Sequence, residues 1–198
     1  MRKLVLLFVI FASVGMTGCT TPARNNQVSY QWSSGSEQDM LTQVKQAAEH
    51  GDADAQFDLG VMYTKGEGVA KVADARKAYA WFRKAAERGH PIAQHLVGEA
   101  YLNGIGGVAK DEKRAREWLI KATPGLRTLA EQGNAWARNE AQFRLAINLM
   151  CGVPGEPGVA KDEAQAMKWL KKAAAQGDER AQEALNFIKR AGGDVCSN

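Results

Sequence analysis

Residues 55–71 read AQFDLGVMYTKGEGVAK, and two later stretches of the chain repeat this pattern. Residues 93–110 read AQHLVGEAYLNGIGGVAK, and residues 141–161 read AQFRLAINLMCGVPGEPGVAK. Each copy opens with Ala-Gln, has a large and a small residue four and five positions later, and ends in Gly-Val-Ala-Lys. A frame of this length is not expected to occur three times by chance, so the chain contains internal repeats.

A second recurring element follows each copy, where a Trp precedes one or two Ala residues. The Trp residues are Trp81, Trp118 and Trp169. In the first element the recurring residues stand at offsets of zero, four, five and eight, which places them on one face of a helix. The second element has the Trp and Ala residues on one stripe and charged residues outside it. Because one helical hairpin cannot bury its apolar stripe alone, the sequence predicts an all-α solenoid of stacked antiparallel helix pairs.

Residues between these elements are suited to helix ends. We expect the N-caps to include four Asp residues and the helix C-termini to include three Gly residues, since these types favour such positions. They are Asp52, Asp111, Asp162 and Asp178, and Gly51, Gly89 and Gly177.

The second unit is longer than the first. The frame Ala residues are 38 positions apart from Ala55 to Ala93 and 48 apart from Ala93 to Ala141. We place the roughly ten extra residues at 123–133. Pro124-Gly125 is expected to break the helix, with a further helical turn or two before Gly133.

The N-terminus has the features of an export signal. Arg2-Lys3 precede an apolar run, and small residues lead to Cys19, which predicts a signal peptide at 1–18. This end resembles a bacterial lipobox, which implies lipidation of Cys19 and an anchored protein of the cell envelope, in the outer membrane facing the periplasm. An ordinary secretory signal or an uncleaved anchor is the alternative. Residues 19–36 are expected to form a flexible tether.

The repeat frame resembles the Sel1-like repeats, which are related to tetratricopeptide repeats. The resemblance covers residues 40–190 approximately and implies a right-handed superhelix that acts as an adaptor or regulator. Val72, Ala146 and Leu149 depart from the pattern. We expect a solenoid at 37–191, with full repeats near 53–89, 91–133 and 134–177, half-repeat caps near 37–51 and 178–191, and a C-terminal tail at 192–198.

Few residues suggest a catalytic site or a binding site for a metal or cofactor. The spacing of His90 and His95 is not that of a helical zinc pair, and His50 precedes a helix-ending Gly, so no metal and no cofactor is expected. The Gly-rich segments recur in every unit and are explained as turns. Without the signal segment, 24 basic residues stand against 22 acidic ones. Lys and Arg alternate with Asp and Glu along the chain, so we expect no nucleic-acid partner.

Cys151 and Cys196 form a possible disulfide, since the final helix should bring the chain end near Cys151. The alternative is two free thiols, because spacing alone does not establish a bridge.

A protein-binding surface is expected on the concave side, where the first helices of such hairpins line the array. The residues at offsets two, six and nine from each frame Ala point there, and several are apolar, which is unusual for a solvent face. The alternative is that Phe57 and Phe143 pack against the neighbouring repeat. The predicted surface consists of Phe57, Val61, Thr64, His95, Glu99, Leu102, Phe143, Ile147 and Met150.

The sequence therefore predicts a membrane-anchored periplasmic scaffold or adaptor that binds another protein and has no catalytic residues. One alternative is an immunity protein that neutralises a phospholipase-type effector delivered between bacteria. A second is a β-lactam-binding or β-lactam-hydrolysing enzyme, which is disfavoured because the chain has no Ser-x-x-Lys motif.

Overall fold

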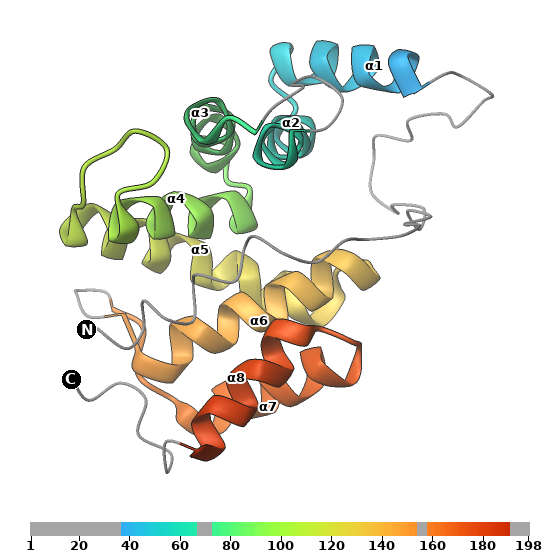
Figure 1. Cartoon of the computed structure of the whole chain (residues 1–198). Helices are drawn as coiled ribbons and strands as arrows, with labels where there is room; N and C mark the ends of the chain where they lie inside the picture. Colours follow the sequence, from blue (N-terminus) through green and yellow to red (C-terminus); the bar gives the residue numbers. More distant parts are fainter. Residues whose placement is uncertain (1–36, 67–72, 154–157, 191–198) are drawn as a thin grey trace. The chain divides into compact units, whose positions relative to one another are not determined.

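The computed structural model describes residues 37–66, 73–153 and 158–190, and all its regular elements are helices. The expected signal peptide, tether and C-terminal tail lie outside these ranges. None of the described helices is long and apolar enough to cross a membrane. In chain order the helices are α1 Glu37–Glu49, α2 Ala53–Lys65, α3 Ala75–Glu87, α4 Pro91–Asn103, α5 Glu112–Gln132, α6 Ala135–Cys151, α7 Glu163–Ala175 and α8 Glu179–Arg190 (Figure 1).

The helices fall into two compact units. The N-terminal unit contains α1 to α4 and the part of α5 that ends at Leu126, and the C-terminal unit contains the rest of α5 and α6 to α8. In the N-terminal unit α2 packs against α1 and α3, and α3 packs against α4; in the C-terminal unit α7 packs against α6 and α8. These helix pairs are all neighbours in the sequence, as stacked hairpins require.

The recurring frame forms the core. Ala55, Ala93 and Ala141 are fully buried, and the large residues four positions later are at most 3% exposed. Gly60 and Gly98 allow the paired helices to approach closely. A Cβ on Gly98 would lie 2.9 Å from Cδ2 of Leu119 and 3.2 Å from the backbone oxygen of Ala115. The predicted inward face of the first helices is confirmed.

Short polar residues cap the helices as predicted. The carboxylate of Asp52 accepts the backbone N–H of Ala55 at 2.7 Å, and Asp111, Asp162 and Asp178 accept equivalent bonds. In the first unit, where Val72 departs from the pattern, Asp74 is the cap and accepts from Arg76 and Lys77. The bond from the N–H of Lys77 lowers the pKa of Asp74. Gly68 and Trp81 are 13 positions apart, whereas the matching Gly and Trp of the later units are 11 apart, so the two extra residues move the cap without removing it.

The recurring Gln joins consecutive repeats. The side chain of Gln56 donates to the backbone oxygen of Ala48 at 3.0 Å, and Gln94 donates to that of Ala86 at 3.2 Å. Gln142 donates to Ala130 at 3.0 Å. These oxygens lie in the last turns of α1, α3 and α5. The carbonyl groups of a last turn receive no hydrogen bond from a following turn of the same helix. Each Gln therefore satisfies a helix end of the preceding repeat.

The expectation that Pro124-Gly125 breaks the helix is wrong. α5 is 21 residues long, and Pro124 lies in its interior. Leu126 is fully buried and Ala130 is 1% exposed, and their burial offsets the helix-breaking cost of Pro, which is about 3 kcal/mol. Gly125 allows α5 to pass close to Pro91 at the start of α4, because a Cβ at this position would lie 2.5 Å from Cγ of Pro91.

The extra residues of the second unit are also not confined to 123–133. α6 has 17 residues, whereas α2 and α4 have 13 each. It begins six positions before its frame Ala141, while α2 begins two positions before Ala55. Asn134 caps α6 by accepting the N–H of Ala137 at 2.9 Å. The insertion therefore lengthens two helices and leaves a short loop between them.

We predict that Gly98→Ala lowers the free energy of unfolding by about 1–3 kcal/mol, because the new methyl group would overlap Leu119. Helix propensity alone would raise stability by about 1 kcal/mol. Urea unfolding followed by circular dichroism measures the change, with Ala80→Gly on the exposed side of α3 as the propensity control. An unchanged or more stable Gly98→Ala protein would show that the close approach is not required.

Candidate functional site

The structure places the nine residues of the predicted concave surface in three classes. Phe57, His95 and Met150 are only 1–5% exposed, so their prediction as surface residues is wrong. Thr64 is exposed. The half-buried members, which can contact a partner, are Val61, Glu99, Leu102, Phe143 and Ile147.

Phe57 is buried because α3 of its own repeat and the residue that caps the next helix both cover it. Its ring stacks on the imidazole of His90 with a centroid distance of 4.4 Å and an interplanar angle of 11°, and it lies 5.7 Å from the ring of Phe82. His90 also caps α4, since its Nδ1 accepts the N–H of Ala93 at 3.1 Å. The alternative that Phe57 packs against the neighbouring repeat is therefore correct.

His95 is held inside the N-terminal unit by a carboxylate of its own helix. Its Nε2 lies 3.2 Å from Oε1 of Glu99, one helical turn later. His95 is 1% exposed. Within the described ranges, no group of three or more His, Cys, Asp or Glu side chains is arranged to hold a metal ion.

In the C-terminal unit a charge network surrounds Phe143. Glu140 contacts Arg144 of its own helix and Arg180 at the start of α8, each with a nitrogen–oxygen distance of 2.6 Å. Arg180 also contacts Asp178 at 2.7 Å. The guanidinium carbon of Arg180 lies 4.6 Å from the centre of the Phe143 ring, a cation–π geometry. This network joins α6 to α8 and fixes the Phe143 ring between them.

The electrostatics of the network favour its charged form. Burial by itself would raise the pKa of Glu140, but the positive charges and hydrogen bonds of Arg144 and Arg180 outweigh it and lower the pKa to about 2. Glu140 and Asp178 raise the pKa of Arg180 against the opposing effect of burial. Glu140 and Arg180 therefore stay ionised at neutral pH, and their ion pair persists beside Phe143.

Sequence reasoning missed this network. Glu140 and Arg144 are four positions apart, which is the spacing of a helical ion pair and could have been noticed. Arg180 is 40 positions from Glu140, and their contact depends on how α8 lies beside α6. No sequence pattern reports that arrangement.

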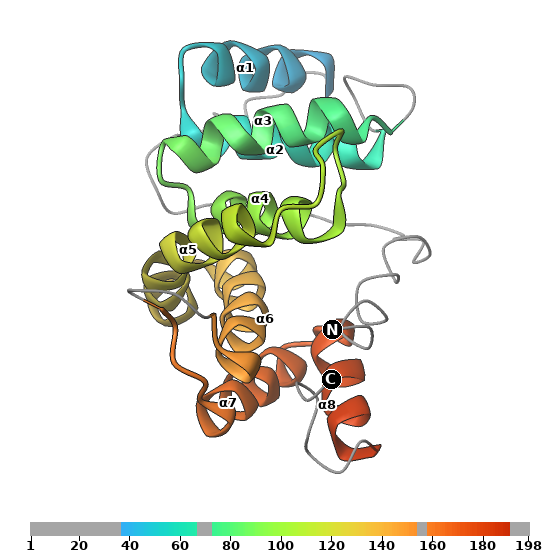
Figure 2. The ribbon, with the colours of Figure 1, turned by 90° about the vertical axis from the view of Figure 1, so that its left-hand side faces the viewer.

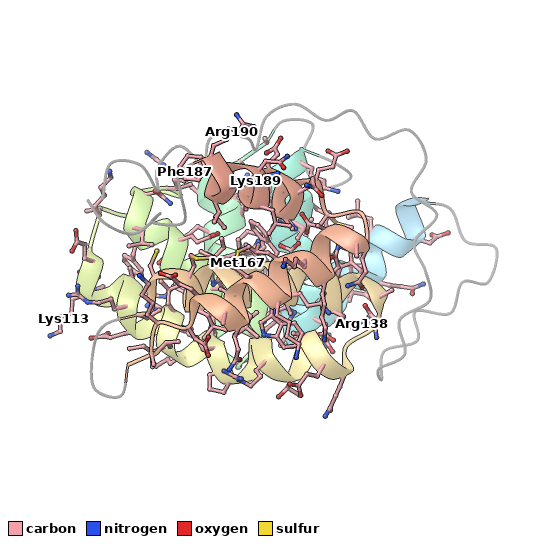
Figure 3. The ribbon with its side chains drawn as sticks, turned by 90° about the horizontal axis from the view of Figure 1, so that it is seen from below. Lys113, Arg138, Met167, Phe187, Lys189 and Arg190 are labelled. Atoms are coloured by element: carbon pink, nitrogen blue, oxygen red, sulfur yellow. The ribbon has the colours of Figure 1, made fainter. Side chains whose placement is uncertain are left out.

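α8, which Arg180 joins to α6, also contains aromatic and basic residues near its end. Figure 3 labels Phe187, Lys189 and Arg190 on this helix. Phe187 is half-buried, whereas Lys189 and Arg190 are exposed. We name Phe143, Ile147, Arg180 and Phe187 the α6/α8 face. It combines apolar side chains with positive charge on two adjacent first helices of the repeat pattern.

Cys151, the last residue of α6, is disulfide-bonded. The chain has two other cysteines, Cys19 and Cys196, and both lie outside the described residues. The predicted Cys151–Cys196 pairing therefore stays a prediction. Lipidation of Cys19 would use the thiol of that residue and leave Cys196 as the partner within the chain.

Comparison with known proteins finds Sel1 repeats in this chain. The model of the Sel1 repeat family matches residues 53–90, 91–123 and 139–178. A solved Sel1 repeat protein from Oxalobacter formigenes is 35% identical, over 75% of this chain and 98% of that protein, with a TM-score of 0.44. The recurring frame that forms the core thus falls within three family repeats.

Curated relatives are much longer proteins. Chitin synthase regulatory factor 3 of Schizosaccharomyces pombe is 32% identical over 71% of this chain, and the match covers 14% of that protein. The ERAD-associated E3 ubiquitin-protein ligase component HRD3A of Arabidopsis thaliana is 34% identical over 41% of this chain and 12% of its own length. The chain therefore spans about one seventh or less of these relatives.

We predict that Glu140→Gln destabilises the protein by about 3 kcal/mol at pH 7, because it removes the charge that neutralises the buried Arg144. The contribution of Glu140 is complete above its ordinary pKa of 4.5 and is lost as pH falls toward about 2. Urea unfolding at several pH values should show the two proteins converging in that interval. Glu163→Gln, which breaks the exposed pair with Lys161, should cost under about 1 kcal/mol. Equal losses for both variants would refute the network.

Peptide mass mapping under non-reducing conditions is predicted to find Cys151 linked to Cys196. Reduction should lower the free energy of unfolding by about 2–4 kcal/mol, since the bridge would close a loop around α7 and α8. A free Cys151 thiol, or a link to Cys19, would contradict this pairing.

Proposed function

Because the chain belongs to the Sel1 repeat family, we propose that it is a protein-binding scaffold tethered to a bacterial membrane in the periplasm, without catalytic activity. The names of its relatives, a regulatory factor and a ligase component, support a regulatory or adaptor role rather than a catalytic one. A scaffold acts by binding a partner, and this requires a binding surface on the protein.

The observation that carries the proposal is the α6/α8 face. Phe143 and Ile147 are only half-buried although they lie next to a charged network, and Arg180 is fixed over the Phe143 ring by two carboxylates. An aromatic ring and an Arg that are already ordered lose little conformational entropy when a partner binds. Aromatic residues and Arg also contribute most to the binding energy of protein interfaces. Because the two carboxylates neutralise the charges of Arg144 and Arg180, this face suits a protein partner with an apolar surface.

Two observations support a location outside the cytosol. Disulfides such as that of Cys151 persist in oxidising compartments, of which the bacterial periplasm is one. The lipobox-like end at Cys19 favours a lipid anchor on the membrane. Together they favour a scaffold that is concentrated at the membrane surface by its tether.

Affinity capture from envelope extract tests the proposal. We predict that Phe143→Ala with Ile147→Ala reduces capture of the specific partner at least about tenfold, because two interface side chains are lost. Lys168→Ala with Lys171→Ala, on the exposed side of α7, is the matched control and should capture as the unchanged protein does.

Circular dichroism of both variants verifies folding before capture. If the Phe143 and Ile147 variant is folded and retains every partner, the α6/α8 face is not the binding site. The identity of the captured protein separates the two roles considered: a phospholipase-type effector indicates immunity, and an envelope-assembly or regulatory protein indicates scaffolding.

A further inference from the structure

Charge in the N-terminal unit is separated between its helices. The even alternation of Lys and Arg with Asp and Glu that the sequence suggests does not hold here. Over residues 74–88 and 110–126, which comprise α3, the first part of α5 and their caps, nine Lys and Arg residues are exposed against three acidic residues. The exposed basic residues are Arg76, Lys77, Arg83, Lys84, Arg88, Lys110, Lys113, Arg114 and Lys121. We name this set the α3/α5 face.

The first helices of the same unit have the opposite charge. α2 and α4 with their N-caps contain Lys65 as their basic residue and the acidic residues Asp52, Asp54, Asp58 and Glu99. α2 and α4 therefore differ in sign from α3 and the first part of α5, and α1, with Glu37, Asp39 and Glu49 against Lys45, is acidic as well. A solvated surface without a charged partner would not require such a separation.

The basic helices lie on one side of the unit. Figure 2 shows α3 and the first part of α5 in front of α2 and α4. The N-terminal parts of α3 and α5 both contact Tyr101 of α4. The ring of Tyr79 meets the Tyr101 ring edge-on with a centroid distance of 6.2 Å, and the guanidinium of Arg114 lies 5.7 Å from the centre of the Tyr101 ring. Lys113 projects away from the start of α5 (Figure 3). The positive charges thus form one surface.

Much of this charge is not neutralised within the protein. Lys77, Arg83 and Arg114 each pair with an acidic residue of their own helix or cap. In the ranges that define the α3/α5 face, the other six exposed basic residues have no carboxylate within the ion-pair distance of 4.0 Å. Two of them, Lys84 and Lys121, lie over the rings of Trp81 and Trp118 at 3.8 and 4.7 Å. The same pair recurs in the third repeat, where Lys172 lies 4.5 Å over Trp169, so it belongs to the repeat frame, and the exposed positive charges themselves carry the argument.

We propose that the α3/α5 face binds the anionic phospholipid headgroups of the membrane that carries the protein. This inference rests on the membrane anchoring proposed above. The seventeen residues between Cys19 and α1 would give a mean span of roughly 20–25 Å for a flexible chain, which keeps the unit close to the bilayer. α1 takes the place of a second helix in the repeat pattern, because its Ala47-Ala48 and Gly51 match Ala85-Ala86 and Gly89. α1 itself has an excess of acidic residues, so the contact with anionic headgroups is assigned to α3 and the first part of α5 alone.

Vesicle co-sedimentation tests the proposal. The protein used is residues 20–198, which lacks the lipid attachment site and contains every described helix. It should bind vesicles of phosphatidylcholine with about one third phosphatidylglycerol, bind pure phosphatidylcholine at least about tenfold less, and lose binding as salt is raised. The variant with Arg76→Glu, Lys84→Glu and Lys113→Glu should bind the anionic vesicles at least about tenfold more weakly.

The matched control reverses three exposed lysines of the C-terminal unit, Lys168→Glu, Lys171→Glu and Lys189→Glu, and gives the same net charge. It should keep most of the binding. Equal loss in both variants, equal binding to neutral and anionic vesicles, or no binding to either would overturn the proposal. If the α3/α5 variant keeps vesicle binding but loses a captured protein, the face binds protein and the lipid assignment is wrong. Capture through the α6/α8 face should be unchanged in the α3/α5 variant, which separates this test from that of the proposed function.

Discussion

Backbone carbonyl groups in the last turn of a helix can accept hydrogen bonds from outside the helix, and in this protein the next repeat supplies a side-chain donor, in addition to the turn N–H of Gly51 at Ala48 and of Gly89 at Ala86. Gln56 and Gln94, in the first turns of α2 and α4, and Gln142, in the middle of α6, each donate to a carbonyl in the last turn of the preceding helix. The frame Ala beside each Gln is fully buried, so the Ala and the Gln of each pair both contribute to the contact with the neighbouring helices. The stacking decides which side of each helix is exposed. The positions of the α6/α8 face and of the α3/α5 face therefore depend on it.

Stacking also decides which side chains a partner can reach. In the N-terminal unit the turn residue His90 folds over Phe57 and removes it from the surface. In the C-terminal unit Phe143, at the same offset in the frame, is covered on one side by Arg180 and stays half-buried. The difference arises near the start of the next first helix, where the N-cap His90 stacks on Phe57, whereas Arg180, the second residue of α8, lies over Phe143. Equivalent positions in a repeat array can therefore have different roles, one structural and one available for binding.

The sequence predicts the helix pairs, the caps and the buried frame, because these depend on residues a few positions apart. Gly98 opposite Leu119 illustrates this, since a small residue next to a large one in the frame is enough to indicate that two helices approach closely. Pro124 misleads, because its helix-breaking tendency is a local property and the burial of Leu126 is not. The Glu140–Arg180 contact and the separated charges of α3 and α5 come from residues far apart in the chain. They are determined by how the repeats stack, which a single sequence does not report.

The central claim is that the α6/α8 face holds a protein partner while the molecule is at the membrane. Site-specific photo-crosslinking in living cells tests it most directly, with a photoreactive residue at Ile147 and, for comparison, at the exposed Gln165 of α7. The account predicts a discrete crosslinked protein from position 147 and none from position 165. The same adducts from both positions, or none from position 147 in cells that contain the partner, would contradict it.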